Sequence, residues 1–171
     1  MDLSPSAPEP GRATDATKDR CYARLVAQLG DLLHGERDFI ANAANTASLI
    51  FHTLPELNWA GFYLLRGGEL VVGPFQGKPA CTRIALGRGV CGQAAQARQT
   101  IVVDDVHQFP GHIACDGASN AEIVVPLILA GRLVGVLDLD SPVPGRFDAG
   151  DRAGLECLVR VLLERSEIGG G

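Results

Sequence analysis

The sequence contains no long uninterrupted run of apolar residues. A membrane-spanning helix needs about 20 consecutive apolar residues, whereas the hydrophobic residues here, 46% of 171, are spread along the chain. The opening segment MDLSPSAPEPGRAT also lacks the basic start and the apolar stretch of a secretory signal. We therefore expect no membrane partner, a disordered tail over residues 1–16, and a cytoplasmic location.

Clusters of basic residues are missing as well. The net charge is −5, and the 15 lysines and arginines are scattered rather than gathered into one patch or stripe. A nucleic-acid-binding surface needs such a patch. The composition thus predicts no nucleic-acid partner.

Closely spaced pairs of metal ligands are absent too. Zinc sites usually bring their ligands in pairs such as C-x2-C or H-x3-H, but Cys81 and Cys91 are ten residues apart, and His107, His112 and Cys115 follow spacings of five and three. We expect no metal site, and we expect both histidines to form hydrogen bonds within their loop. A Cys–His hydrolase centred on Cys115 is disfavoured, because no oxyanion-hole signature accompanies it and nearby carboxylates would repel an oxyanion.

The elements that are present predict an α+β fold. Helical stripes run over residues 18–34 and 37–54. We expect one domain over residues 17–166, with a central antiparallel sheet of about five to six strands, the terminal helices packed on one face and ligand loops on the other. Residues 167–171 are expected to form a frayed tail. The further elements are strands over 59–65, 69–75, 82–85, 100–103, 121–129 and 133–141, a short helix over 90–98, and a last helix over 148–166 capped by Asp148.

The last predicted hairpin gathers three carboxylates. Alternation along its strands places Glu122, Asp138 and Asp140 on one face. The opposite face is apolar, with Ile123, Val125, Leu127 and Leu129 on the first strand and Leu133, Leu137 and Leu139 on the second. Adjacent carboxylates repel one another, so such a cluster needs a cation, a shared proton or a metal.

The register of this hairpin depends on the length of its turn. A three-residue loop over residues 130–132 pairs Leu129 with Leu133 and sets Glu122 opposite Asp140. A two-residue loop is expected to reverse the parity and to put leucines beside the aspartates. Burial of a large aliphatic side chain contributes about 1.5–3 kcal/mol, which favours the three-residue loop.

Five cysteines fall into two groups. Cys21 and Cys157 lie on or beside helical stripes, where a free cysteine is usually a small packing residue. Cys81, Cys91 and Cys115 lie in loops rich in glycine and proline, GPFQGKPACTR, GRGVCG and FPGHIACDGASN. Structural disulfides are rare in a reducing cytosol, so the loop cysteines are candidates for redox chemistry.

Redox chemistry requires particular partners around such thiols. A thiolate that attacks an oxidised centre becomes a sulfenic acid, which a second thiol resolves to a disulfide. A carboxylic acid can protonate the departing oxygen, and Glu122, Asp138 and Asp140 are available for this. Trp59 and Tyr63 are four residues apart on one strand, so they share a face and can form a pocket wall.

Several blocks of the sequence, NWAGFY, GPFQGKPACTRI, GRGVCG, FPGHIACDGASNAEIVVPL and GVLDLDSP, closely resemble those of the free methionine-(R)-sulfoxide reductases, which are GAF-domain enzymes. The resemblance extends over residues 17–165. It implies a GAF fold, reduction of free L-methionine-(R)-sulfoxide to L-methionine, no bound cofactor, electrons from thioredoxin and ultimately NADPH, a role in the repair of oxidative damage, and a homodimer.

The resemblance also implies a role for each site residue. Cys115 corresponds to the thiol that attacks the sulfoxide sulfur, Cys81 to the resolving thiol, and Cys91 to an auxiliary or alternative resolving thiol. The remaining matches are the substrate-binding acids Glu122, Asp138 and Asp140 and the aromatic wall residues Trp59 and Tyr63. A pocket with carboxylates for a free ammonium would reject peptide-bound methionine, and we expect enclosure under the loop 104–120 to set this specificity.

Two other functions remain open on the sequence. One is a non-catalytic GAF sensor that binds a small ligand, although 171 residues leave no room for an added output domain. The other is a metal-binding redox sensor. Thiol counting separates a sensor from the reductase: mixed with methionine-(R)-sulfoxide, a sensor would lose no thiols, and the reductase would lose two per turnover.

Overall fold

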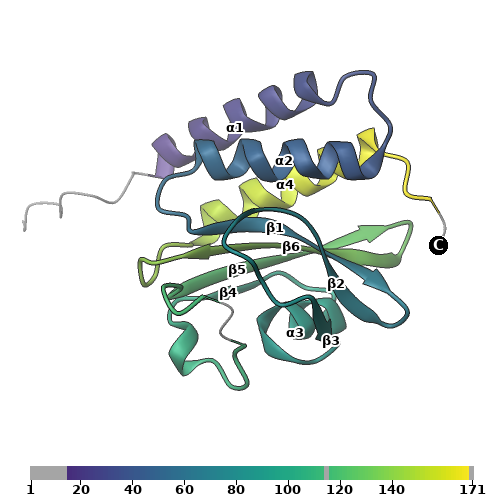
Figure 1. Ribbon diagram of the computed structural model, residues 1–171. Coiled ribbons are helices and arrows are strands. Elements are labelled where there is room, and N and C mark those ends of the chain that lie inside the picture. The colour runs from purple at the N-terminus through teal and green to yellow at the C-terminus, as the bar shows by residue number, and fades with distance from the viewer. Residues whose placement is uncertain (1–14, 114–115, 170–171) are drawn as a thin grey trace, which may run out of the picture.

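The structure, a computed structural model, describes residues 15–113 and 116–169. Six strands form one antiparallel sheet with the order β3-β2-β1-β6-β5-β4 (Figure 1). The strands are β1 (Trp59–Arg66), β2 (Glu69–Gly77), β3 (Arg83–Ala85), β4 (Ile101–Val103), β5 (Ala121–Leu129) and β6 (Arg132–Ser141). The helices are α1 (Asp15–Leu32), α2 (Phe39–Thr53), α3 (Gly89–Ala97), the 3-10 helix η1 (Val106–Gln108) and α4 (Ala149–Arg165).

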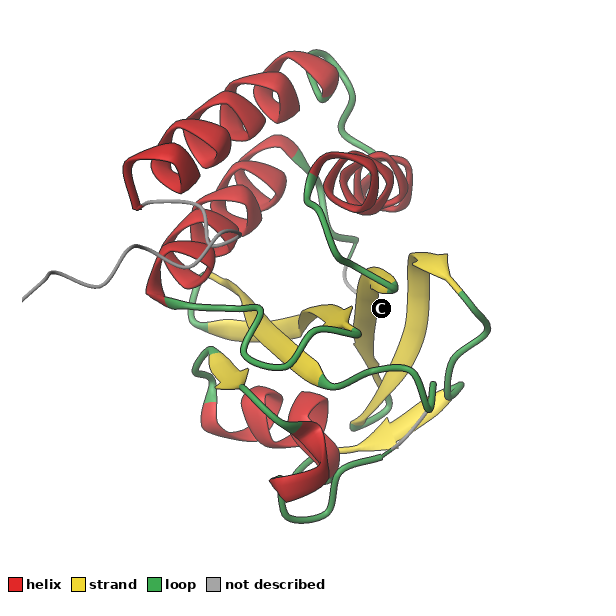
Figure 2. Cartoon of the chain, turned by 90° about the vertical axis from the view of Figure 1, so that its left-hand side faces the viewer, coloured by secondary structure: helices red, strands yellow, loops and turns green. Residues whose placement is uncertain are grey.

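The sheet separates two unequal layers. Helices α1, α2 and α4 cover one face, and α3 with the loop that carries η1 lies on the other, as two perpendicular views show (Figures 1 and 2). The α+β class, the antiparallel sheet and the distribution of helices and loops are therefore confirmed. No helix in the described part of the chain combines the length and apolarity that a membrane crossing demands.

Capping residues fix the ends of the long helices close to their predicted positions. The side chain of Asp38 accepts a hydrogen bond from the backbone N–H of Ala41 at the start of α2. At the start of α4, Asp148 and Asp151 form a capping box, which satisfies backbone donors that a helix end leaves free. Helix α1 begins at Asp15, three residues before the predicted start at 18.

The turn of the β5–β6 hairpin differs from the prediction. The pairing of Leu129 with Arg132 leaves a two-residue turn, Ala130–Gly131. Both turn residues have positive φ, 49° and 75°, as a tight hairpin turn that follows the strand twist requires. The predicted three-residue loop, with Leu129 opposite Leu133, is wrong.

A β-bulge nevertheless preserves the predicted register at the other end of the hairpin. Ile128 pairs with Leu133 but Leu127 pairs with Gly135, so Val134 has no cross-strand partner. This extra residue returns the following residues of β6 to the sheet faces that were predicted for them. The expectation for a two-residue turn did not include a bulge. Leu133 consequently packs on the α3 side of the sheet. Val134 takes the place that was predicted for Leu133, on the side covered by α1, α2 and α4.

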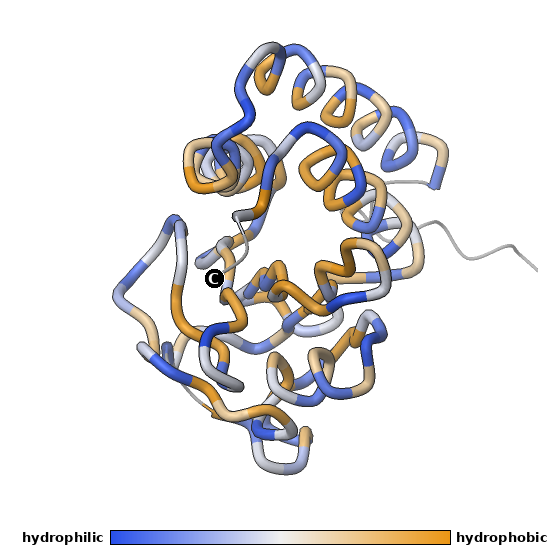
Figure 3. The backbone as a smooth tube through the Cα atoms, turned by 90° about the vertical axis from the view of Figure 1, so that its right-hand side faces the viewer, coloured by the Kyte–Doolittle hydropathy of each residue, from blue (hydrophilic) through white to orange (hydrophobic). Residues whose placement is uncertain are grey.

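The core follows from this alternation. Apolar residues run along the strands and along parts of the helices (Figure 3). The larger cluster lies between the sheet and helices α1, α2 and α4, and the smaller one lies between the sheet and α3. The smaller cluster contains aromatic residues and a cysteine, and the carboxylates of the hairpin adjoin it.

Candidate active site

Three carboxylates converge on the sheet face that α3 covers. Glu122 in β5 lies opposite Asp140 in β6, and Val124 lies opposite Asp138, which is the predicted register. Glu122 and Asp138 are each only 6% exposed. All three acids line one cavity, together with residues from α3 and from the loops.

These carboxyl groups hold their protons more tightly than exposed ones. Burial raises the pKa of Glu122, and the negative charge of Asp140 raises it further. Burial raises the pKa of Asp138 as well, with a further contribution from the charge of Glu122. Burial, followed by the charges of Asp138 and Asp116, also raises the pKa of Asp140.

Among the described residues, no lysine or arginine forms an ion pair with any of the three. Buried acids without a cation keep a proton at a pH where exposed carboxyl groups are ionised. The cluster is thus equipped to donate a proton.

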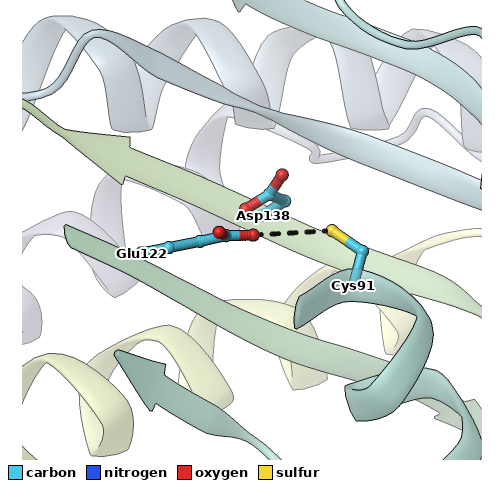
Figure 4. A group of neighbouring side chains, drawn as sticks. All are labelled: Cys91, Glu122 and Asp138. Atoms are coloured by element: carbon cyan, nitrogen blue, oxygen red, sulfur yellow. Dashed lines mark hydrogen bonds between the residues drawn. The ribbon is translucent and has the colours of Figure 1, made fainter. Parts of the chain in front are cut away.

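Helix α3 brings a thiol to the acids. The Sγ atom of Cys91 lies 3.9 Å from Oε1 of Glu122 and donates a hydrogen bond to it (Figure 4). Burial raises the pKa of the Cys91 thiol, and the charges of Asp138 and Glu122 raise it further. A protonated thiol is a poor nucleophile, so the surroundings of Cys91 disfavour it as an attacking group.

Close packing beside Cys91 fixes its position. A Cβ atom on Gly92 would lie 2.4 Å from the backbone oxygen of Ala85, so only glycine allows α3 to pack this closely against β3. The backbone N–H of Gly87 donates to the oxygen of Gly92 over 2.8 Å. The GRGVCG block therefore anchors the start of the helix that carries the thiol.

The aromatic side chains line the same cavity. Trp59 pairs with Asp140 and Gly61 pairs with Asp138 across strands β1 and β6, so this stretch of β1 runs beside the acids. The rings of Trp59 and Tyr63 stack with centroids 5.8 Å apart. Burial, followed by the charge of Asp138, raises the pKa of Tyr63, which keeps its hydroxyl neutral.

A third ring, missed in the sequence, supports the aromatic wall. Phe75 in β2 stacks on Trp59 with centroids 5.3 Å apart. A Cβ on Gly61 would lie 2.3 Å from the Cβ of Phe75 and 2.8 Å from the Trp59 ring. The glycine in NWAGFY therefore leaves the space in which these rings pack over the strand.

The loop after β4 supplies further residues that sequence reasoning missed. His112 Nε2 lies 3.5 Å from Oε2 of Glu122, and burial lowers the pKa of His112, which favours the neutral imidazole. The prediction of hydrogen bonding within the loop fits His107, whose Nε2 lies 2.9 Å from Oδ1 of Asn120, but His112 points into the site. Only its place in an unusually long loop hinted at this.

Asn58, the residue before β1, is hydrogen-bonded to that loop. Its Nδ2 donates to Oγ of Ser119 over 3.0 Å and to Oδ2 of Asp116 over 3.3 Å. The Ser119 side chain in turn offsets part of the rise in the pKa of Asp140. The backbone N–H of Ala118 lowers the pKa of Asp116, with Asn58 and Lys78 contributing further. Asp116 is therefore the ionised acid of this neighbourhood.

The structure describes two of the three predicted redox cysteines, Cys81 and Cys91. Cys115, predicted to attack the substrate, lies outside the described residues. Cys81 is disulfide-bonded and follows Ala80, a residue of the cavity lining. Cys21, Cys91 and Cys157 carry free thiols, and of these Cys91 lines the cavity.

One group of described residues has the composition of a metal site. Ligand atoms of Cys91, Glu122 and Asp138 all lie within 4.8 Å of one another. They belong to three separate elements, α3, β5 and β6 (Figure 4). The long spacings between them in the sequence gave no indication of this arrangement.

Comparison with known proteins gives consistent results. A family model described as GAF domain matches residues 41–162. The free methionine-R-sulfoxide reductase of Escherichia coli (strain K12) is 52% identical over 145 residues, which cover 85% of this chain and 88% of the relative. The protein of the same name from Saccharomyces cerevisiae is 40% identical over 158 residues, which cover 88% of each chain.

A solved structure agrees with these relatives. The free methionine-R-sulfoxide reductase from Neisseria meningitidis in complex with its substrate superposes with a TM-score of 0.83. Its sequence is 42% identical, and the match covers 94% of each chain.

Proposed function

The chain belongs to the GAF-domain family and, within it, to the free methionine-(R)-sulfoxide reductases, and on that premise we propose that it reduces free L-methionine-(R)-sulfoxide to L-methionine. One feature of the cavity carries most weight: the buried carboxyl groups of Glu122 and Asp138 lie beside a thiol and an aromatic wall. Sulfoxide reduction needs a proton for the oxygen, which these acids can supply, and a further thiol that renews the attacking one, which Cys91 can supply. A non-catalytic sensor needs neither.

The acids and the rings divide the work of binding. Glu122 and Asp138 share a proton that polarises the sulfoxide oxygen, and Asp138 and Asp140 accept hydrogen bonds from the ammonium group. Oδ1 of Asp138 supports this role, because it is buried and has no hydrogen-bond partner among the described residues. Trp59 and Tyr63 enclose the methyl group against their stacked rings.

The chemical step reduces the sulfoxide and oxidises a cysteine. The Cys115 thiolate attacks the sulfur while the acids protonate the oxygen, so that the S–O bond breaks, water leaves and an S–S bond joins Cys115 to methionine. Water then attacks Sγ of Cys115, which breaks that S–S bond, frees methionine and leaves Cys115 as a sulfenic acid. Cys81 then attacks that sulfur, forming a disulfide and releasing water. The disulfide state of Cys81 supports its part in this exchange.

Cys91 acts as the auxiliary thiol. Its hydrogen bond to Glu122 and its raised pKa keep the Cys91 thiol protonated. It reacts only when a disulfide comes close enough to exchange with it. We further propose that thioredoxin, and ultimately NADPH, returns the electrons, that the enzyme is a homodimer without a bound cofactor, and that it works in the reducing cytoplasm.

Specificity for the free amino acid follows from charge. A free ammonium compensates Asp138 and Asp140, whereas the amide nitrogen of a peptide leaves a buried carboxylate without a cation, which costs several kcal/mol. Enclosure under the loop 104–120 contributes to this exclusion. Turnover of a methionine-sulfoxide peptide at a rate near that of the free amino acid would refute it.

Single-turnover experiments on the reduced protein test the mechanism. Wild type is expected to release methionine and to lose two thiols for each molecule released, as a sensor would not. Cys115→Ser should release none, and Cys157→Ser, which changes a cysteine outside the cavity, should behave as wild type. Methionine release by Cys115→Ser would show that another residue is the nucleophile.

A further inference from the structure

The group formed by Cys91, Glu122 and Asp138 offers more than a proton. Its thiol and two carboxylates converge from three elements, and their ligand atoms lie within 4.8 Å of one another (Figure 4). All three residues are buried. The mechanism uses the acids for substrate binding and proton transfer and Cys91 as an auxiliary thiol, and none of these roles uses the three ligand atoms together.

The spacing suits a small tetrahedral cation. With Zn–S near 2.3 Å and Zn–O near 2.0–2.2 Å, neighbouring donor atoms of a tetrahedral zinc site lie roughly 3.5 Å apart. The Sγ of Cys91 and Oε1 of Glu122 are 3.9 Å apart. Small rotations of these side chains would reach coordination distance.

Asp138, whose free oxygen the substrate ammonium would also use, provides a second indication of a ligand. Its Oδ1 atom is buried without a hydrogen-bond partner among the described residues, and the residue is 6% exposed. A buried oxygen without a donor is destabilising and rare in folded proteins. A cation at the centre of the group would satisfy it and offset the repulsion between the carboxylates.

His112 stands where an outer partner of a metal ligand is expected. Its Nε2 lies 3.5 Å from Oε2 of Glu122, the carboxylate oxygen that does not accept from Cys91. Contacts of this kind, from outside the ligand set, orient ligating carboxylates. Three protein ligands with one open position match zinc sites that keep a water.

We propose that Cys91, Glu122 and Asp138 bind one Zn²⁺ ion in the cavity, with His112 orienting Glu122. The thiolate selects zinc over magnesium and calcium, which prefer an all-oxygen shell. The metal takes no part in the proposed reduction. It occupies atoms that the substrate needs, so zinc-bound and substrate-bound states exclude each other.

Equilibrium binding of Zn²⁺ alone tests the site. The protein is kept without reductant, so that Cys81 stays in its disulfide while Cys91 is free, and Zn²⁺ is titrated against a chromogenic chelator. Wild type is expected to bind one equivalent. Cys91→Ser should bind at least about 100-fold more weakly, since loss of an outer partner alone costs about 10- to 100-fold.

Matched variants separate the ligands from other thiols. Cys157→Ser removes a free cysteine outside the cavity and should bind as wild type. With Co²⁺ in place of Zn²⁺, wild type and Cys157→Ser should show a thiolate-to-metal charge-transfer band that Cys91→Ser lacks. Circular dichroism of the metal-free variants checks folding, and Asp138→Asn provides the comparison if Cys91→Ser does not fold.

Two results would overturn the site: no binding by wild type, or equal affinity in wild type, Cys91→Ser and Asp138→Asn. Neither depends on turnover. If the protein binds Zn²⁺ but does not reduce methionine-(R)-sulfoxide, the metal site stands and the proposed function fails. If it reduces the sulfoxide but binds no Zn²⁺, the proposed function stands and the metal site fails.

Discussion

Two groups of buried acids lie on opposite sides of the sheet, and they differ in what compensates them. On the helix side, Asp151 is 1% exposed and receives hydrogen bonds from Lys18 over 2.7 Å, from Tyr22 over 2.8 Å and from Arg146 over 3.2 Å. On the α3 side, Glu122 and Asp138 are equally inaccessible but have a thiol and a neutral histidine as neighbours.

The difference separates structural from functional acids. A buried acid with its cations in place stabilises the packing of its own element against those that supply the cations, here α4 against α1 with Lys18 and the segment before α4 with Arg146. A buried acid without a cation costs stability, and a fold retains it where a ligand supplies the missing charge or takes the proton. Four predictions test this contrast, from the largest expected effect to the smallest.

Neutralising an uncompensated acid should abolish activity without loosening the fold. Asp138→Asn is expected to lower kcat/KM by at least about 100-fold, because general acid catalysis contributes about 10² to 10⁴-fold. Its free energy of unfolding should not fall by more than about 1 kcal/mol, since no ion pair is lost. Single-turnover release and urea denaturation measure the two quantities, and a large loss of stability with activity intact would reverse the assignment.

Neutralising the compensated acid should have the opposite effect. Asp151→Asn leaves Lys18 and Arg146 without their buried partner, which is expected to cost about 3 kcal/mol of unfolding free energy. Activity per folded molecule should stay near that of wild type, because Asp151 lies outside the cavity. Loss of kcat/KM in a sample shown to be folded would contradict the contrast.

Glu122 and Asp138 should also respond to pH with the opposite sign from Asp148, the other acid that Lys18 binds. The raised pKa values of Glu122 and Asp138 mean that the folded state binds more protons than the unfolded one. Their contribution to stability therefore falls as pH rises from the unfolded value, near 4, towards the folded one. Glu122→Gln should flatten this fall in urea denaturation at pH 5 to 8.

Asp148 provides the matching control. Burial alone would raise its pKa, but the hydrogen bond from Lys18 and those from the Asp151 and Gly150 backbone lower it overall. Its stabilisation is therefore present above the unfolded value and is lost as pH falls through the folded one. Asp148→Asn should reduce stability at pH 7 and converge with wild type in acid, and a constant difference would contradict this.

The smallest effect is expected at the hairpin turn that sets the register of the site acids. Ala130 has φ of 49° and is exposed. Ala130→Gly should raise the unfolding free energy by about 0.5–1 kcal/mol, because glycine adopts this conformation without a steric penalty. Activity should not change, and a loss of activity would show that the turn influences the site.

Residues on regular strands were predictable from the sequence. Period-two alternation was enough to place Asp138 with Asp140 and Trp59 with Tyr63. The register that brings Glu122 to the same face was also predicted correctly, although the loop from which it was predicted was wrong. The larger apolar core follows for the same reason, since its strand residues alternate with the acids. These features depend on local periodicity, which a single sequence records.

Residues placed by irregular structure were not predictable. His112, Asp116 and Ser119 lie in a loop without periodicity, and their contacts with Glu122 and Asn58 depend on how that loop folds back. The proximity of Cys91 to Glu122 depends on how α3 packs on the sheet. Gly92 permits this close packing, but its presence in the sequence does not predict it. The bulge at Val134 was missed because turn length was treated as the only determinant of parity.

That bulge gives the hairpin a tolerance to changes in length. The turn lies at one end of the strands and the acids at the other, and Val134 is the one residue between them without a cross-strand partner. An insertion in the turn could be offset by a deletion at Val134, and the cross-strand pairs of Glu122 and Asp138 would remain as they are. Related chains that differ by one residue at this tip can therefore carry the same arrangement of carboxylates.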